Sequence, residues 1–433
     1  MRIKIFIFIL ISQFAFAQTT YVPDDNFEQA LIDLGYDDTL DDYVLTANIS
    51  VVTSLNVSQK EISNLTGIES FTALTHLQCE YNSLTTLDVS SNTSLTHFDC
   101  GGNQLTTLDV SNNTALFSFE CYDNQLTSLD VSNNTNLDEL YCQNNQLTSL
   151  NVSSNTLLTR IECESNQLTS LDVSNNTALT ILGLNYNQFT TIDVSNNTLL
   201  VALACHDNEL TSLDISSNTA LANLQCGGNQ LTSLDVSNNT SLDDNLNCQG
   251  NQLTYLNMKN GITNALTNFD ARDNSLTCIE TLDPDWATAN WTSAGENIDA
   301  GVEFSVVCAP EGYTYVPDDN FEQALIDLGY DDVLNDFVLT ENISGVTTLD
   351  VSVKEISDLT GIEDFTALTN LQCGSNSLTS LDVSANTALT SLSCYGNQLT
   401  SLDVSANTAL TSLICDANQL TSLDVSANTA LTS

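Results

Sequence analysis

Hydrophobic and polar residues alternate along most of this chain in a repeat of 21 residues, which is clearest in residues 126–146, LTSLDVSNNTNLDELYCQNNQ. Alternate residues of a strand point to the same side, so Leu140 and Cys142 predict a short strand with one buried face. Asn145 closes the turn that follows this strand. The second half of the repeat, LTSLDVS in residues 126–132, has an LxxLxV pattern and predicts a second extended segment on the opposite side.

The repeat returns from Leu84 to the region of Leu276. A fixed period of about 20 to 29 residues with LxxLxCxxNxL predicts a leucine-rich-repeat solenoid. The predicted fold class is a mostly β repeat solenoid, with two short strands and two turns in each coil and little helix. Asparagine occupies the turn position in almost every coil, where a buried amide satisfies backbone groups of neighbouring coils. These asparagines include Asn82, Asn103, Asn124, Asn166, Asn187 and Asn208.

Eleven of the 13 cysteines are rungs of the repeat and not a scattered disulfide framework. They are Cys79, Cys100, Cys121, Cys142, Cys163, Cys205, Cys226, Cys248, Cys373, Cys394 and Cys415, with Leu184 in one place of the series. Parallel side chains aimed into one core have poor torsions for disulfides, and buried cysteine packs as a small hydrophobe. We therefore expect reduced core thiols, with some disulfide pairs, or metal and redox roles, as the alternatives.

The ends of the repeat region predict caps. Residues 22–35, VPDDNFEQALIDLG, place Phe27, Leu31 and Leu34 on one apolar face before Gly35, which predicts a helix over the first coil. After Phe269 the repeat decays, and Cys278 and Cys308 enclose both tryptophans. We predict a disulfide between these two cysteines, which would stabilise the fold by about 3 to 4 kcal/mol on the chain-entropy model.

The design then starts again, because residues 315–332 copy residues 21–38 at an offset of 294. The chain is therefore expected to hold two tandem arrays, and its last repeat stops halfway, so we expect a fragment of a longer reading frame. The predicted division is a signal peptide at 1–17, a helical cap at 18–63, array 1 at 64–277, a cap and linker at 278–312, a second cap at 313–357 and array 2 at 358–433.

Charge and the N-terminal segment bear on location and partners. Residues 1–17 have Arg2 and Lys4, an apolar run and Ala15-Phe16-Ala17, which is typical of a secretory signal cleaved after Ala17. No other stretch approaches the roughly 18 apolar residues of a membrane span. The 55 acidic and 7 basic residues give a formal charge of −48, which argues against nucleic-acid binding. A secreted or cell-surface protein is expected.

Residues 52–77, VTSLNVSQKEISNLTGIESFTALTHL, resemble the junction of cap and first repeats in bacterial internalins. The repeat with its inward cysteine resembles the cysteine-ladder repeats of internalin J and the irregular bacterial class called IRREKO. The signal end, caps and tandem layout are similar to those of secreted repeat proteins of Bacteroidetes-type bacteria. The resemblance implies surface attachment or adhesion, although the chain has neither the wall-anchoring motif of internalins nor a C-terminal sorting domain.

The motifs of catalysis are absent from the sequence. There is no GxSxG, HExxH, CxxC, phosphate-binding glycine loop or EF-hand pattern, and the acidic stretch 37–42 lacks the glycine of a calcium loop. We expect no enzymatic activity. His76, His97 and His206 fall on or beside one strand face as solvated side chains, or, as the alternative, the first two share a metal ion with Asp99 or Glu80.

An aspartate recurs at one position of successive coils, and each carboxylate repels the next. The column comprises Asp88, Asp109, Asp130, Asp172, Asp193, Asp214 and Asp235, and Asp382, Asp403 and Asp424 repeat it. Hydrogen bonds from neighbouring serine and threonine residues offset the repulsion, or calcium bridges the column. No other cofactor is expected.

A ligand is best sought where the repeats differ from one another, at the outward positions of the strand and the two residues after it. In array 1 these residues are His76, Tyr81, His97, Asp99, Glu120, Tyr122, Asp123, Glu139, Tyr141, Arg160, Glu162, Tyr186 and His206. Tyrosine is favoured at recognition sites because its ring buries a large area while its hydroxyl still finds a partner. In array 2 the same positions are mostly Ser, Gly and Gln.

Three functions remain open on the sequence. The first is a secreted or surface-displayed adhesion protein that binds a protein or glycan. The second is a self-associating structural rod, and the third is the binding module of a longer secreted enzyme. The sequence leaves the oligomeric state open.

Overall fold

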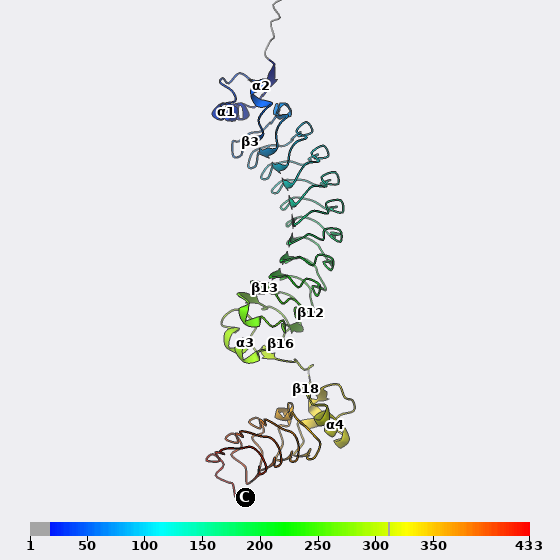
Figure 1. Ribbon diagram of the computed structural model, residues 1–433, viewed down its shortest axis with the longest axis vertical. Helices are drawn as coiled ribbons and strands as arrows, with labels where there is room; N and C mark the ends of the chain where they lie inside the picture. The colour runs from blue at the N-terminus through cyan, green and yellow to red at the C-terminus, as the bar shows by residue number, and fades with distance from the viewer. Residues whose placement is uncertain (1–17, 311) are drawn as a thin grey trace, which may run out of the picture. The chain divides into compact units, whose positions relative to one another are not determined.

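The computed structural model describes residues 18–310 and 312–433, so the predicted signal peptide lies outside the described residues. The chain forms two compact units, unit 1 up to Val306 and unit 2 from Val307, and each has its own hydrophobic core. Both units are solenoids of short parallel strands (Figure 1). The leucine-rich-repeat fold class predicted from the sequence is confirmed.

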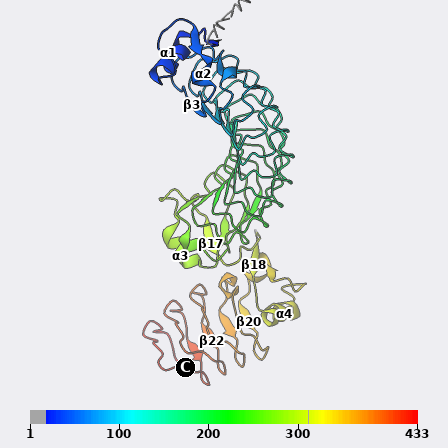
Figure 2. The ribbon, with the colours of Figure 1, turned by 45° about the horizontal axis from the view of Figure 1, so that its top comes forward.

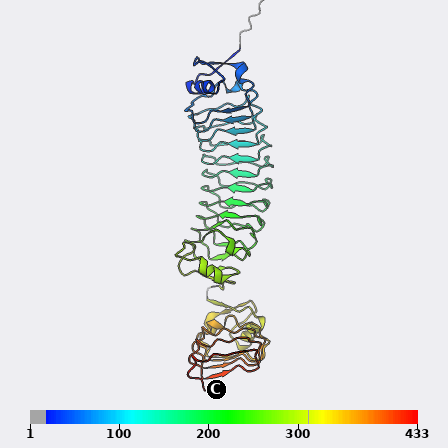
Figure 3. The ribbon, with the colours of Figure 1, turned by 60° about the vertical axis from the view of Figure 1, so that its left-hand side comes forward.

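One strand of each coil in unit 1 joins a parallel sheet of 11 strands, and these strands appear as a ladder of arrows in Figure 3. Each strand is three residues long, and its middle residue is a buried apolar side chain. Consecutive strands pair in register, so that Leu77 lies opposite Phe98 and Phe98 opposite Phe119. The strands are β3 (Ser54–Asn56), β4 (His76–Gln78), β5 (His97–Asp99), β6 (Ser118–Glu120), β7 (Glu139–Tyr141), β8 (Arg160–Glu162), β9 (Ile181–Gly183), β10 (Ala202–Ala204), β11 (Asn223–Gln225), β13 (Asn245–Asn247) and β15 (Asn268–Asp270).

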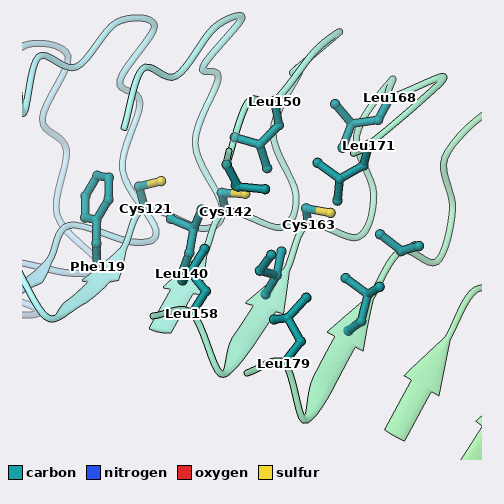
Figure 4. Close-up of a cluster of buried hydrophobic side chains, with 14 of the residues drawn as sticks. Phe119, Cys121, Leu140, Cys142, Leu150, Leu158, Cys163, Leu168, Leu171 and Leu179 are labelled. Atoms are coloured by element: carbon teal, nitrogen blue, oxygen red, sulfur yellow. The ribbon is translucent and has the colours of Figure 1, made fainter. Parts of the chain in front are cut away.

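The core of unit 1 is a set of aligned columns of leucine and cysteine. Figure 4 shows Cys121, Cys142 and Cys163 in one row, with Leu140 on the strand side and Leu150 across the core. The eleven ladder cysteines are free, and ten of them are buried. The structure therefore places these thiols in the core, as the sequence predicts.

The second segment of the repeat forms strands only in the last coils of unit 1, so the predicted second strand in every coil is wrong. Figure 1 shows the strands of the main sheet on the inner side of a curve, and a curved stack separates its coils more on the outer side. There, consecutive coils share few backbone hydrogen bonds, such as Gln125 N to Leu105 O. The later coils add bonds such as Thr254 N to Thr232 O. The second sheet is β12 (Ser233–Asp235), β14 (Tyr255–Asn257), β16 (Cys278–Glu280) and β17 (Glu303–Ser305).

Two columns of buried asparagine join the coils. In the predicted column, Asn124 Nδ2 donates to the carbonyl oxygens of Cys100 and Cys121, and its Oδ1 accepts from Leu105 N. The second column was not predicted. In it, Asn134 Nδ2 donates to the carbonyl oxygens of Val110 and Asn113. Because the donors reach across coils, both columns fix the stacking distance.

The N-terminal cap contains α1 (Asp25–Asp33), α2 (Thr46–Ile49) and the antiparallel pair β1 (Thr19–Tyr21) and β2 (Tyr43–Leu45), seen at one end of unit 1 in Figure 2. Asp24 caps α1, and its second oxygen accepts from the backbone and hydroxyl of Ser63. Burial alone would raise the pKa of Asp24, but its hydrogen bonds lower it overall. Phe27 and Leu31 are buried as predicted, whereas Leu34 is 46% exposed.

Tight contacts explain why residue 67 of this cap is a glycine. Gly67 precedes the 3₁₀ helix η1 (Ile68–Ser70) with φ +107°, and a Cβ there would lie 2.9 Å from Tyr21 O. An L side chain would be strained and would also clash with the backbone. Glycine is therefore required where the first coil passes under the cap.

At the other end of unit 1 the repeat gives way to aromatic packing. The short elements η2 (Thr263–Ala265) and α3 (Pro284–Asn290) lie there, and α3 contacts β17. The Trp291 ring lies 4.5 Å from the Phe269 ring and 5.2 Å from the Trp286 ring, measured between centroids. Cys278 and Cys308 are both disulfide-bonded, and the bridge between them stays a prediction.

Unit 2 repeats the arrangement with fewer coils. Its cap has the antiparallel pair β18 (Tyr313–Tyr315) and β19 (Phe337–Leu339), α4 (Asp319–Leu328), α5 (Thr340–Ile343) and η3 (Ile362–Asp364). Its parallel sheet has four strands, β20 (Thr348–Asp350), β21 (Asn370–Gln372), β22 (Ser391–Ser393) and β23 (Ser412–Ile414). Within the described residues of both units, no helix has the length and apolar character needed to cross a membrane.

Candidate binding surface on the strand face

The strand face is the surface formed by the outward residues of the 11-stranded sheet and of the turn after each strand. Because the middle residue of each strand is buried, its first and third residues point outward. The parallel register then sets His76 beside His97 and Asp99 beside Glu120. It also sets Glu139 beside Arg160. The structure therefore places the predicted ligand residues of successive coils side by side.

A cluster of rings lies at the N-terminal part of the strand face. His76 and His97 are stacked, with centroids 4.4 Å apart and planes 7° apart. The ring of Phe117 lies 5.8 Å from that of His97 and is 45% exposed. Sequence reasoning missed Phe117, although it stands where the equivalent residue of most coils is polar, and that contrast was the available signal.

Two tyrosines extend this ring surface over a pair of glycines. Tyr81 and Tyr122 have centroids 6.2 Å apart in an edge-to-face arrangement. A Cβ at Gly101 would lie 2.4 Å from the Tyr122 ring, and one at Gly102 would lie 2.5 Å from the Tyr81 ring. The glycines therefore make room for both rings to pack closely against the turns. The sequence predicted the two tyrosines but not the role of Gly101 and Gly102.

Carboxylates beside the rings are partly buried, and this changes their ionisation. Burial is the main cause that raises the pKa of Asp99 to about 7, and the charges of Glu120 and Glu80 add to it. Burial and the charge of Glu139 raise the pKa of Glu120. Asp99 is therefore poised to exchange a proton near neutral pH.

The neighbouring histidines do not complete a metal site. Each Nδ1 lies within hydrogen-bond distance of a threonine hydroxyl, 2.9 Å for His76 with Thr75 and 3.0 Å for His97 with Thr96. In the described part of the chain, one group of three acidic, histidine or cysteine side chains has its ligand atoms within 4.8 Å of one another. This group lies elsewhere, in the second cap. The alternative of a shared metal ion gains no third ligand here.

Further along the strand face the contacts become polar. Arg160 pairs with Glu162 on its own strand, and its guanidinium lies 5.2 Å from the centre of the Tyr141 ring. The ring of Tyr186 meets that of His206 edge-on at 4.8 Å. His206 Nδ1 lies 2.8 Å from Asp207, which the sequence analysis did not name. Glu139 lies on the same strand as Tyr141, and Asp123 directly follows Tyr122.

The aspartate column lies on the other segment of the coil, away from the strand face. Each carboxylate accepts a hydrogen bond from the backbone N–H of the serine two residues later, for example Asp109 from Ser111 at 2.9 Å. Hydrogen bonds from Ser111 lower the pKa of Asp109. The same bond is present at Asp88, Asp130, Asp172, Asp193, Asp214 and Asp235. Calcium bridging of this column stays a prediction.

Comparison with known proteins bears on the fold and the family of this chain. No family model matches the chain. Internalin J of Listeria monocytogenes serotype 4b is 38% identical over 72 residues, which is 17% of this chain and only 8% of that protein. The solved functional domain of the Listeria monocytogenes protein, which includes a cysteine ladder, is 31% identical, with 96% of this chain and 75% of that chain covered and a TM-score of 0.55.

Two more distant structures share the fold. A leucine-rich-repeat protein of Leptospira interrogans is 20% identical, with 89% of this chain and 90% of that chain covered and a TM-score of 0.50. The leucine-rich-repeat ectodomain of a plant membrane receptor kinase from Arabidopsis thaliana, solved in complex with CASPARIAN STRIP INTEGRITY FACTOR 2, is 19% identical, with 90% and 47% covered and a TM-score of 0.50.

Fold and core thus define a leucine-rich-repeat solenoid with an inward row of cysteines. The chain belongs to the internalin-like family of leucine-rich-repeat proteins, because the solved internalin J domain is similar over most of both chains. The resemblance inferred from the sequence is confirmed.

Proposed function

We propose that this protein is a secreted or surface-displayed adhesion protein whose strand face in unit 1 binds a protein or glycan partner. The observation that carries the proposal is the ring surface of the first coils. Tyr81 is 50% exposed. Its ring and that of Tyr122 occupy space that a Cβ at Gly102 and Gly101 would fill. Exposed, preorganised rings lose little entropy on binding and present a large area to a partner.

The partner's chemistry follows from what surrounds the rings. Asp99 and Glu120 supply hydrogen-bond acceptors next to the rings, and the chain carries 55 acidic residues against 7 basic ones. Flat rings flanked by carboxylates suit the apolar face and hydroxyl groups of a sugar. They suit equally a protein surface that presents basic side chains. The plant ectodomain solved with its factor shows a protein partner on the same fold.

Secretion is part of the same proposal. The apolar N-terminal segment with Ala15-Phe16-Ala17 supports export, although its structure lies outside the described residues. Membership of the internalin-like family supports display at a cell surface. The experiment is to locate the chain in its own organism by fractionating cells and medium, with a chain lacking residues 2–17 as the control.

Binding is tested by screening the chain against a glycan array and an array of extracellular proteins. The double variant Tyr122→Ala plus Tyr141→Ala is expected to lose at least tenfold in affinity for whatever binds, with an unchanged melting temperature. Tyr395 occupies the place of Tyr122 in unit 2 and is 38% exposed, so Tyr395→Ala is the matched control. Equal loss in both variants, or no loss in the double variant, would contradict the proposal.

A structural rod remains the second candidate, supported by the regular frame and the tandem copies. A rod predicts self-association that grows with concentration and no selective ligand. Sedimentation velocity over a hundredfold range of concentration separates the two. A monomer at every concentration argues against the rod. The third candidate, a module of a longer secreted enzyme, predicts activity only in a product longer than this chain.

A further inference from the structure

Each helical cap buries a glutamate with one carboxylate oxygen unused. Glu322 of α4 is fully buried, and its Oε1 accepts a hydrogen bond from Asn335 N at 2.9 Å. Its Oε2 is buried without a hydrogen-bond partner. In the first cap, Glu28 Oε1 accepts from the backbone of Asp41 and Tyr43, and its Oε2 is likewise buried and unpartnered. A buried carboxylate oxygen is costly unless a ligand satisfies it.

Two exposed carboxylates converge on the Glu322 carboxylate in the second cap. Asp319 and Asp336 each offer a carboxylate oxygen, and together with one from Glu322 these atoms lie within 4.8 Å of one another. Asp319 lies three residues before Glu322, on the same side of α4. Asp336 comes from the loop before β19. Oxygens up to 4.8 Å apart match a cation bound at about 2.4 Å from each, the distance that calcium prefers.

Negative charge accumulates here without a positive neighbour. In the described part of the chain, the ion pairs that reach the cap helices are Lys60 with Asp33 and Lys354 with Asp327. Both involve the last turn of their helix, away from the glutamate. Asp331, on the same loop as Asp336, also has a buried Oδ2 with no hydrogen-bond partner. Among the described residues, no basic side chain forms an ion pair with the carboxylates on the side of the cap that holds Glu322.

The same three residue types recur in the first cap, although their ligand atoms do not all lie within 4.8 Å of one another there. At the offset of 294, the first cap carries Asp25, Glu28 and Asp42. The loop aspartate has a positive φ in both copies, 68° at Asp42 and 66° at Asp336, so the two loops follow the same path. The unpartnered glutamate oxygen is present in both caps.

We propose that Asp319, Glu322 and Asp336 bind a divalent cation in the cap of unit 2, and that Asp25, Glu28 and Asp42 do so in the cap of unit 1. The donors are all carboxylate oxygens, which selects a hard cation, and two of the three side chains are exposed and adjustable, which favours calcium over the more demanding magnesium. The bound ion fastens the cap helix to the loop that leads into the antiparallel strand pair.

The test is isothermal titration of the full chain with calcium chloride in about 0.15 M sodium chloride, after removal of metals with a chelator. Salt screens diffuse attraction by exposed acids. The expected result is two ions per chain, one in Glu322→Gln and none in Glu28→Gln plus Glu322→Gln. One ion that disappears with Glu322→Gln would support the site in unit 2 and overturn its extension to unit 1.

Asp336→Asn is a second variant, chosen because it removes a ligand without disturbing the buried part of the cap. Asp336 is exposed, and asparagine tolerates a positive φ, so this variant keeps the fold while losing one ligand. It is expected to weaken binding in unit 2 at least tenfold. Asp416→Asn, an exposed acid in the turn after β23 of the same unit, is the matched control and is expected to change nothing. Absence of calcium binding, or binding that neither Glu322→Gln nor Asp336→Asn alters, would overturn the proposal.

Discussion

Side-chain amides hold neighbouring coils together at the residue scale. An asparagine of either column serves two coils, because it donates to carbonyl oxygens of its own or the preceding coil. Loss of one such side chain leaves those carbonyl groups buried and unpaired, and a buried unpaired polar group costs about 1 to 3 kcal/mol.

Asn134→Ala is therefore expected to lower the free energy of unfolding by about 2 to 3 kcal/mol, because Asn134 is fully buried and donates two hydrogen bonds across coils. Asn136→Ala is the control, since Asn136 is exposed and donates to Thr114 O. Urea denaturation followed by circular dichroism measures both. Equal destabilisation by the two variants would contradict the role assigned to the buried column.

A second residue-scale prediction concerns pH. Burial raises the pKa of Asp99 to about 7 from the ordinary value of 3.8, so between about pH 4 and pH 7 the folded chain binds more protons here than the unfolded chain. Asp99 therefore lowers stability as the pH rises through this window. The melting temperature of Asp99→Asn minus that of the unchanged protein is expected to grow from pH 4 to pH 7 and then level off.

Asp109→Asn supplies the comparison for that experiment. Hydrogen bonds from Ser111 lower the pKa of Asp109, so it stays ionised in both states above about pH 5. Its difference from the unchanged protein is expected to be constant from pH 5 to pH 8. A constant difference for Asp99→Asn as well would show that Asp99 titrates normally.

At the scale of the element, the cysteine ladder is a column of buried thiols in which one member, Cys415, is only partly buried. Burial raises the pKa of Cys142 to about 12, which suppresses the reactive thiolate. Cys415, directly after the last strand, is only partly buried, and burial raises its pKa too. In the native protein, iodoacetamide is expected to label Cys415 first, as peptide mass spectrometry would show. Uniform labelling of all rungs before unfolding would contradict a closed core.

The elements also show how far a sequence alone leads. The strand around Leu140 and the helix around Phe27 were predicted, because apolar spacing directly encodes which face is buried. The prediction of a second strand in every coil was wrong. Backbone pairing between these segments depends on the curvature of the stack, which the sequence of a single repeat does not encode.

The sequence predicted which positions form the candidate surface, but not the shape of that surface. Differences between repeats pointed to Tyr81 and Tyr122, but the space that Gly101 and Gly102 leave for them depends on contacts between coils. The cluster in the second cap was missed for the same reason. Asp336 is 14 residues from Glu322 in the sequence, and only the folded loop brings them together.

At the scale of the whole molecule, the two separate cores predict two unfolding transitions. The core of unit 1 ends at Ile298, and that of unit 2 begins at Val316. Leu392→Ala is expected to lower the midpoint of one transition by the equivalent of about 3 kcal/mol, and Leu140→Ala that of the other, because both side chains are fully buried. Differential scanning calorimetry resolves them, and a single transition that both variants shift alike would contradict independent cores.

The direction of the hydrogen bonds between strands has a mechanical consequence. In a stack of coils these bonds run along the long axis, so a pull between the two ends of unit 1 loads the coils in series. The weakest link opens first, and one peeled coil of 21 residues releases about 70 Å of extended chain. Each further coil then opens in turn. Such an array yields stepwise under tension and dissipates work at every step, which would protect a tethered contact from sudden load.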